Sequence, residues 1–234
     1  MPFWSRPQRP AAYAEQALVT AILDGTYPPG STLPGERTLA EKLGVTRPTV
    51  REALQRLERD GWLTIAQGRP TLVNDYWTAG GLNVLSGLVR YGDHLPPGFT
   101  SKLLEVRLAL APAYTRAAVA CAAATVAAFL AGYASLADDA RTFAAYDWSL
   151  HHTLTVASGN PVYTLILNGF CGFYEQVAHI YFAPPQARAS SRRFYAALLA
   201  AAQRSDAAEA ERVTRDVMRE SIDLWKQVSG NGSA

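Results

Sequence analysis

Apolar residues recur at helical spacing in the first part of the chain, and glycines and prolines mark the helix ends. Residues 12–23 place alanine, leucine and isoleucine on one stripe, and this pattern stops at Gly25 and the turn 28–30. Residues 36–43 predict a shorter helix, with Gly44 in the C-cap position. The pattern therefore predicts two helices before residue 45.

A third helix and a hairpin follow. Thr46 is the candidate N-cap, and Pro48 falls in the first turn, where a missing N–H costs nothing. The helix is expected to run to about Asp60, and its buried stripe is Val50, Ala53, Leu54 and Leu57. Residues 62–65 and 71–73 then read as two strands. A helix, a glycine turn and a second helix form the helix-turn-helix arrangement.

The remainder of the chain is rich in alanine and leucine at helical spacing, with few β-branched runs. It predicts an antiparallel helical bundle, in which Asn160-Pro161 begins one helix and residues 211–227 form another. The expected fold is therefore mainly α, with an α+β N-terminal domain and an all-α C-terminal domain. The expected divisions are a domain at 1–76, a linker at 77–81, a helical domain at 82–228 and a disordered tail at 229–234.

Composition narrows the class of protein. The 234 residues suit one large domain or two small ones, and a hydrophobic fraction of 49% excludes wholesale disorder. The formal net charge of +2 excludes a generally polycationic binder, although a local basic patch remains allowed. Cys121 and Cys171 share no short spacing, which favours free thiols. The N-terminus lacks a secretory signal pattern, so a cytoplasmic protein is expected.

One uncharged stretch, Ala117 to Ala137, is long enough to span a bilayer. It consists mostly of alanine, which contributes little transfer energy beside leucine or phenylalanine. We therefore expect a soluble, alanine-rich helix and no membrane partner.

The start of the third predicted helix carries the strongest chemical signal. Arg47 and Arg51 lie one turn apart on one face, where arginine pairs bidentately with guanine. Thr46 and Thr49 suit phosphate contacts. A surface of solvated ion pairs is the alternative, since residues 1–76 hold nine basic and eight acidic residues. Cations at a helix start interact unfavourably with the helix dipole, so placing them there costs free energy. This cost favours a functional role for the arginines, namely DNA binding.

Many fixed positions in this region resemble the winged helix-turn-helix of the GntR family of transcription regulators. The matching segments are Pro29-Gly30-Ser31-Thr32-Leu33-Pro34-Gly35-Glu36-Arg37, Gly44-Val45-Thr46-Arg47 and Thr49-Val50-Arg51-Glu52-Ala53-Leu54. Further segments are similar to the FadR subfamily and extend nearly to the end of the chain. They include Asp60-Gly61-Trp62-Leu63-Thr64-Ile65, Ala157-Ser158-Gly159-Asn160-Pro161, Phe194-Tyr195 and Glu220-Ser221 with Trp225.

The resemblance implies DNA contacts from the third predicted helix, from the helix before it (residues 36–43) and from the tip of the predicted hairpin, which is called the wing in this family. These positions are Arg37, Thr46, Arg47, Pro48, Thr49, Arg51, Gln67, Gly68 and Arg69. Pro48 replaces an expected hydroxyl residue, and Gln67 stands where a histidine is usual. Neither change removes an arginine, so we expect a similar operator. A homodimer on a palindromic operator is implied as well.

The resemblance also implies a helical domain that binds long-chain acyl-CoA. The implied ligand positions are Arg107, His151, Tyr174, Tyr181, Tyr195, Arg215, Met218, Ser221 and Trp225. Arg107 and Arg215 are the candidates for coenzyme A. Met218 replaces a small glycine, and His151 replaces an aromatic residue. From the residues alone, the aromatics are either plain core or the lining of a pocket.

The implied function is repression of fatty acid degradation genes, with release of the protein from DNA by acyl-CoA. Activation of unsaturated fatty acid synthesis genes is a further role within the subfamily. No cofactor is expected, and no catalytic motif points to an enzyme.

The alternative comes from the same superfamily, whose metal-dependent regulators bind a small carboxylate through an Asp and three histidines. Asp147 and His151 have the Asp-x-x-x-His spacing, but Tyr195 and Ser221 stand at the later ligand positions. Two ligands do not complete a metal site, so no metal is expected.

Overall fold

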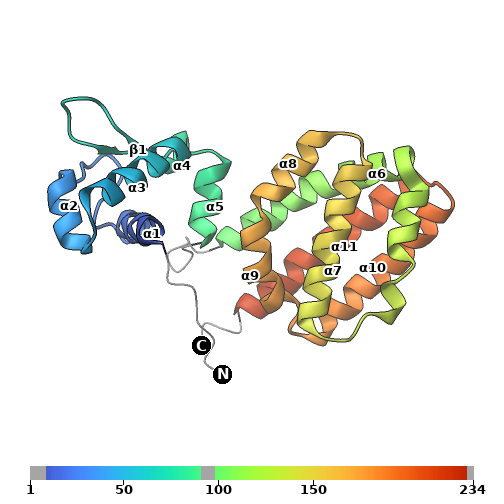
Figure 1. Cartoon of the computed structure of the whole chain (residues 1–234). Coiled ribbons are helices and arrows are strands. Elements are labelled where there is room, and N and C mark those ends of the chain that lie inside the picture. Colours follow the sequence, from blue (N-terminus) through green and yellow to red (C-terminus); the bar gives the residue numbers. More distant parts are fainter. Residues whose placement is uncertain (1–8, 91–97, 231–234) are drawn as a thin grey trace, which may run out of the picture. The chain divides into compact units, whose positions relative to one another are not determined.

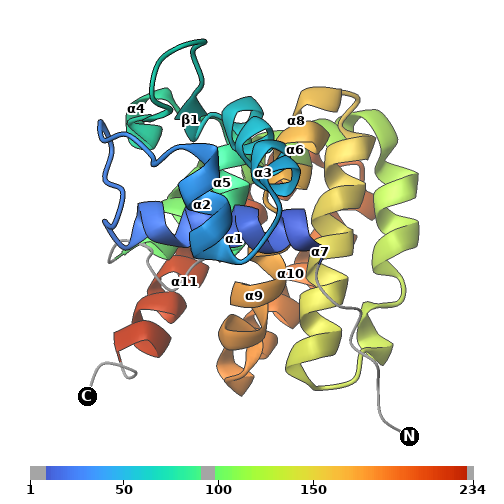
Figure 2. The same cartoon turned by 60° about the vertical axis from the view of Figure 1, so that its left-hand side comes forward.

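The chain forms two compact units, of which the computed structural model describes residues 9–90 and 98–230. The first unit ends at Leu95 and the second begins at Pro96. Figures 1 and 2 show that both are mainly helical, with one small hairpin in the first. The mainly α fold expected from the sequence is confirmed. Each unit has its own core and is described by itself.

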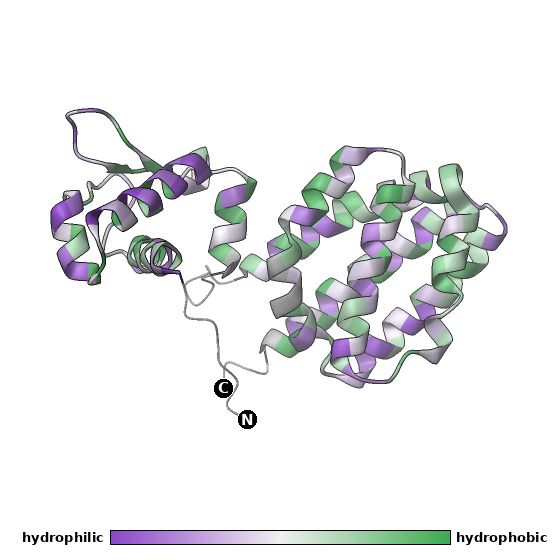
Figure 3. Cartoon of the chain, in the orientation of Figure 1, coloured by the Kyte–Doolittle hydropathy of each residue, from purple (hydrophilic) through white to green (hydrophobic). Residues whose placement is uncertain are grey.

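The first unit begins with three helices that pack together. α1 (Pro10–Leu23) and α2 (Glu36–Leu43) both pack against α3 (Arg47–Asp60). These bounds match the three predicted helices to within two residues. The stripe expected on α3 is buried and consists of Val50, Ala53, Leu54 and Leu57. The remaining surfaces of α2 and α3 carry many hydrophilic residues (Figure 3).

The ends of α2 and α3 follow the predicted caps. The Thr46 hydroxyl accepts a hydrogen bond from the Thr49 backbone N–H at 3.3 Å. Gly44 and Gly61 adopt left-handed φ angles of 65° and 98°, which end α2 and α3 at the residues expected. This local geometry fixes where α3 starts and therefore which side chains its first turn exposes.

The hairpin is short. β1 (Leu63–Thr64) pairs antiparallel with β2 (Leu72–Val73), with Leu63 opposite Val73. Both strands are shorter than predicted. Thr32 adds an isolated bridge to Leu72, which ties the turn before α2 to the hairpin.

The two units divide later than the linker expected at 77–81. That stretch includes most of a short helix, α4 (Tyr76–Ala79), and α5 (Leu82–Arg90) still belongs to the first unit. The reason is packing around the buried side chain of Trp62. Its ring centroid lies 5.1 Å from that of Tyr76 in α4, and its indole is in close contact with α5 at Gly87.

Gly87 is the point where α5 approaches Trp62 most tightly. A Cβ atom at Gly87 would lie 2.9 Å from Trp62 Cζ2, inside contact distance. We expect Gly87→Ala to lower the free energy of unfolding by about 1–3 kcal/mol, because the buried indole must shift. Chemical denaturation of the full chain measures this loss. Gly81→Ala is the matched control, since a Cβ there meets nothing within 4 Å, and an equal loss in both variants would contradict the packing argument.

The second unit is a bundle of antiparallel helices, as predicted. The long helix α6 (Phe99–Leu130) packs against helices that come later in the chain. Its main partners are α7 (Ala140–Ala157), α10 (Pro185–Gln203) and α11 (Ala207–Gly230). The unit also contains η2 (Tyr133–Ser135), α8 (Pro161–Gly169) and α9 (Cys171–Phe182). α11 reaches Gly230, so the expected tail begins with helical residues, and 231–234 lie outside the described part.

α6 is the helix that the alanine-rich stretch predicts, but it ends at Leu130 and does not continue to residue 137. Ala122 has non-helical angles (φ −149°, ψ 47°) and marks a kink within it. Among the described residues, one stretch, Phe99–Ser135, is long and apolar enough to cross a membrane. Core helices pass the same test, and α6 packs against α7, α10 and α11 in the bundle.

Candidate DNA interface and effector cavity

The first turn of α3 presents polar side chains at the surface. Arg47 and Arg51 lie one turn apart, and their side chains are 61% and 58% exposed. The hydroxyls of Thr46 and Thr49 lie 2.8 Å apart, with Thr49 half-buried and Pro48 exposed beside them. This helix start therefore offers two cations and two hydroxyls to a partner, which is the chemistry that DNA contact requires.

Glu36 at the start of α2 positions Arg51. Arg51 donates from Nε to Oε1 at 2.9 Å and from Nη2 to Oε2 at 2.7 Å, a bidentate pair. Arg47 approaches the same carboxylate at 4.0 Å. The hydrogen bonds from Arg51 hold the pKa of Glu36 below its ordinary value. This ion pair joins residues 15 positions apart, and it orients Arg51 in the free protein.

The wing tip supplies the remaining predicted contacts. Gln67, Gly68 and Arg69 are all exposed, and Gly68 has φ 72°, a conformation that favours glycine. Arg51 and Arg69 line one groove between α3 and the wing. Arg37 on α2 is 79% exposed and pairs with Glu41 at 3.9 Å. The unit therefore places Arg51 and Arg69 within one groove, as a combined helix and wing contact requires.

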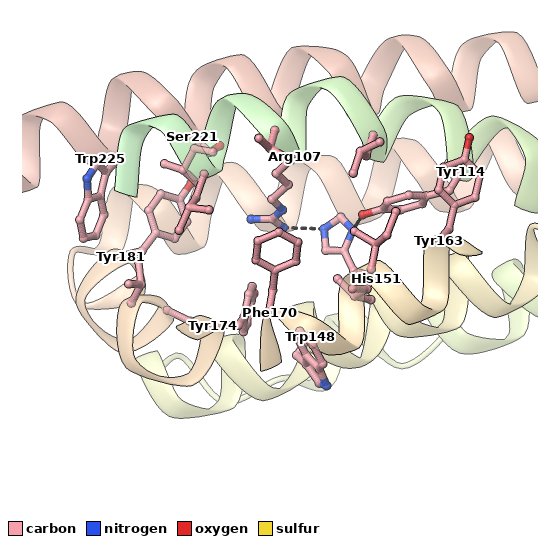
Figure 4. A pocket seen from close by; sticks show the side chains of 18 of the residues that line it. Arg107, Tyr114, Trp148, His151, Tyr163, Phe170, Tyr174, Tyr181, Ser221 and Trp225 are labelled. Atoms are coloured by element: carbon pink, nitrogen blue, oxygen red, sulfur yellow. Dashed lines mark hydrogen bonds between the residues drawn. The ribbon is translucent and has the colours of Figure 1, made fainter. Parts of the chain in front are cut away.

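The second unit encloses a mainly apolar cavity of about 100 Å³. Trp225 and Ser221 lie toward one end, Tyr114 and Tyr163 toward the other, and Arg107 lies between them (Figure 4). The wall comes from α6, α7, α8, α9 and α11. Its apolar residues are Leu103, Leu104, Val106, Leu110, Ile166, Leu167, Phe170, Val177, Ala178 and Phe182.

α6 contributes one continuous stripe to this wall. Leu103, Arg107, Leu110 and Tyr114 are spaced by four, three and four residues, which places them on one helix face. Arg107 is the member of this stripe that was predicted as a ligand residue. The spacing around it is the signal that identifies the other three.

Asp147 on α7 organises the polar side of the cavity. Its side chain is 4% exposed and accepts hydrogen bonds from Arg107 Nη2 at 2.7 Å, from the Tyr174 hydroxyl and from the Tyr195 hydroxyl at 3.0 Å. Burial opposes the charge, yet Arg107 and the two hydroxyls hold the pKa of Asp147 below its ordinary value. Asp147 is therefore a buried carboxylate, fully paired as such a charge must be.

His151 extends this network to Tyr114. Arg107 Nη2 also contacts His151 Nε2, and His151 Nδ1 lies 2.7 Å from the Tyr114 hydroxyl. Burial, followed by the charge of Arg107, lowers the pKa of His151 to about 3. His151 is therefore neutral at physiological pH, and the same burial raises the pKa of Tyr114.

The residues around Asp147 do not fit a metal ion. The Arg107 guanidinium contacts both Asp147 and His151, so a cation already bridges the two candidate ligands. Tyr195 donates to Asp147, and the Ser221 hydroxyl donates to the Met218 carbonyl at 2.7 Å. Within residues 9–90 and 98–230, no group of three or more His, Cys, Asp or Glu side chains is placed to hold a metal.

Two family models together cover most of the chain. The model "Bacterial regulatory proteins, gntR family" matches residues 10–73, and "FadR C-terminal domain" matches residues 74–231. A fatty acid metabolism regulator protein of Shewanella frigidimarina is 43% identical over 94% of this chain and 92% of its own length. The chain belongs to the FadR branch of the GntR family.

Further relatives agree with this assignment. A regulator of the same name from Shewanella sp. strain MR-4 is 42% identical over 94% of this chain and 91% of its own length. Among solved structures, Listeria monocytogenes Lar has a TM-score of 0.61 at 16% identity, covering 94% of this chain and 98% of its own. That likeness supports the fold alone. This FadR-type chain is thus a DNA-binding transcription regulator of fatty acid metabolism.

The cavity gathers most of the ligand positions that the resemblance implies. Arg107, His151, Tyr174, Tyr181, Ser221 and Trp225 all line it. Tyr195 lies behind the wall on Asp147, Met218 is buried outside the lining, and Arg215 pairs with Glu211 at 2.7 Å on the helix surface. Nη2 of Arg107 bonds to Asp147 and to His151, and its contact with coenzyme A remains a prediction.

Proposed function

We propose that the protein is an acyl-CoA-responsive regulator that binds a palindromic operator as a homodimer. In the absence of ligand it represses fatty acid degradation genes and activates unsaturated fatty acid synthesis genes. Long-chain acyl-CoA binds the helical unit and releases the protein from DNA. The relatives named as fatty acid metabolism regulators support this proposal.

One observation carries the proposal: an apolar cavity bounded by five helices lies within the unit that matches the FadR C-terminal domain. Burying a methylene contributes roughly 0.8 kcal/mol, so a long aliphatic chain suits such a wall. The walls hold far more apolar than polar residues, with polar groups concentrated around Arg107, as expected of a ligand site.

The size of the cavity suggests how the ligand acts. At about 100 Å³ it is smaller than the roughly 300–1,000 Å³ of ordinary ligand sites. An acyl chain must therefore separate helices that are in contact in the free protein. Such a rearrangement couples ligand to DNA, typically by 1–3 kcal/mol, and the coupling is reciprocal. Bound operator should thus weaken acyl-CoA binding by the same factor.

The proposal predicts that Trp225→Ala weakens binding of oleoyl-CoA by about 2 kcal/mol, roughly 30-fold, because a large aromatic wall residue is lost. Isothermal titration of the full chain measures the change, and circular dichroism verifies that the helices persist. Trp77→Ala in the first unit is the matched control. Unchanged affinity in the Trp225 variant would place the acyl site elsewhere, and absence of binding by the unaltered protein would contradict the proposal.

A further inference from the structure

A set of three linked polar residues interrupts the apolar wall of the cavity. Arg107, His151 and Tyr114 are joined by hydrogen bonds and extend from Arg107 in the middle of the cavity to Tyr114 at the end near Tyr163 (Figure 4). We call these three residues the polar station. His151 and Tyr114 are 1% and 5% exposed, whereas the Arg107 side chain is 22% exposed.

The direction of each hydrogen bond in the station follows from the chemistry of its groups. A guanidinium can only donate, so Arg107 Nη2 donates and His151 Nε2 accepts. Since the imidazole is neutral, its hydrogen must reside on Nδ1, which donates to the Tyr114 oxygen. The hydroxyl hydrogen of Tyr114 therefore points away from His151.

The station has unused hydrogen-bonding capacity of one kind. Arg107 donates from Nη2 to both Asp147 and His151. No described residue accepts a hydrogen bond from its Nε or Nη1 atoms. No described residue accepts the hydroxyl hydrogen of Tyr114 either. Both residues line the cavity, so the station offers hydrogen-bond donors from Arg107 and Tyr114 at the cavity wall.

We propose that the polar station selects acyl ligands that carry an oxygen within the chain, a hydroxyl or a keto group. This inference rests on the proposed acyl-CoA function and names the ligand class more closely. A plain aliphatic chain passing the station displaces water and leaves buried donors without partners. A chain oxygen at the same depth accepts from Arg107 and Tyr114 instead. His151 is the positioning residue, because its neutral tautomer directs the Tyr114 hydroxyl.

Matched ligand pairs test the proposal on the unaltered, full-length protein. The pairs are oleoyl-CoA with 12-hydroxyoleoyl-CoA, and palmitoyl-CoA with 3-hydroxypalmitoyl-CoA. The readout is the ligand concentration that gives half-release of a labelled operator. We expect at least one hydroxylated ligand to act at about tenfold lower concentration than its plain partner, the effect of a hydrogen bond to a charged donor.

The variant Tyr114→Phe removes the hydroxyl and keeps the aromatic ring, so it tests the contribution of the hydroxyl alone. It should reduce the preference for the hydroxylated ligand by about threefold or more, while release by the plain ligand persists. Tyr146→Phe is the matched control, since its hydroxyl bonds to the Phe129 carbonyl outside the cavity lining. An equal reduction in both variants would overturn the role of Tyr114.

The outcomes separate this inference from the function on which it rests. If plain and hydroxylated ligands release the operator equally in both pairs, the station does not bind a chain oxygen and the inference is wrong. The proposed function then stands without this preference. If no acyl-CoA of either kind releases the operator, the proposed function itself is wrong.

Discussion

Replacement of Asp147 by alanine is expected to lower the free energy of unfolding by about 3–5 kcal/mol, which is the cost of breaking a buried ion pair by removing one partner. The variant leaves the Arg107 guanidinium buried without its carboxylate and deprives the Tyr174 and Tyr195 hydroxyls of their acceptor. Chemical denaturation of the full chain, followed by circular dichroism, measures the loss from the helical unit.

Two further variants make the Asp147 experiment decisive. Asp138→Ala removes a carboxylate that is 64% exposed and bonded to Arg188, and its cost should stay below about 1 kcal/mol. The double variant Arg107→Met with Asp147→Leu removes both charges and should regain most of the stability. A loss below about 1 kcal/mol in Asp147→Ala would contradict the assignment of Asp147 as a buried carboxylate that neutralises Arg107.

The second large effect concerns DNA. Arg51→Ala is expected to weaken operator binding by about 1–3 kcal/mol, roughly 5- to 150-fold, because one bidentate arginine contact is lost. Glu36 orients the Arg51 side chain in the free protein, so little rotamer entropy is lost when DNA binds. Fluorescence anisotropy with a labelled palindrome, at one stated salt concentration, measures the change.

Arg59→Ala is the matched control for Arg51. It removes an exposed arginine at the other end of α3, where the side chain bonds to Asp60. Acyl-CoA affinity should remain unchanged in both variants, because the two arginines belong to the first unit. Equal operator affinity in Arg51→Ala and the unaltered protein would contradict the assignment of the α3 start to DNA.

Local rules predicted the first unit well. Thr46, Gly44 and Gly61 set the bounds of α2 and α3 through capping, which depends on residues within one turn. The division between units was predicted less well. It depends on Trp62 packing against Gly87, a contact between residues 25 positions apart that no periodicity encodes.

The polar network of the cavity was harder to predict for the same reason. Asp147 drew attention only through its spacing from His151, and that spacing suggested a metal ligand pair. Its actual partner, Arg107, lies 40 residues earlier on another helix. Arg215, by contrast, pairs with Glu211 one turn away, a local contact that helical spacing alone allows a reader to anticipate.

We propose that an acyl cavity in the helical unit is coupled to operator binding in the first unit of the same chain. The most direct test is anisotropy of a labelled FadR-type palindrome bound by the purified protein, titrated in parallel with oleoyl-CoA and with free coenzyme A at fixed salt. Release by oleoyl-CoA and not by coenzyme A is the predicted result. Tight operator binding that is unaffected by oleoyl-CoA would contradict the claim and would leave only the DNA-binding half of the account.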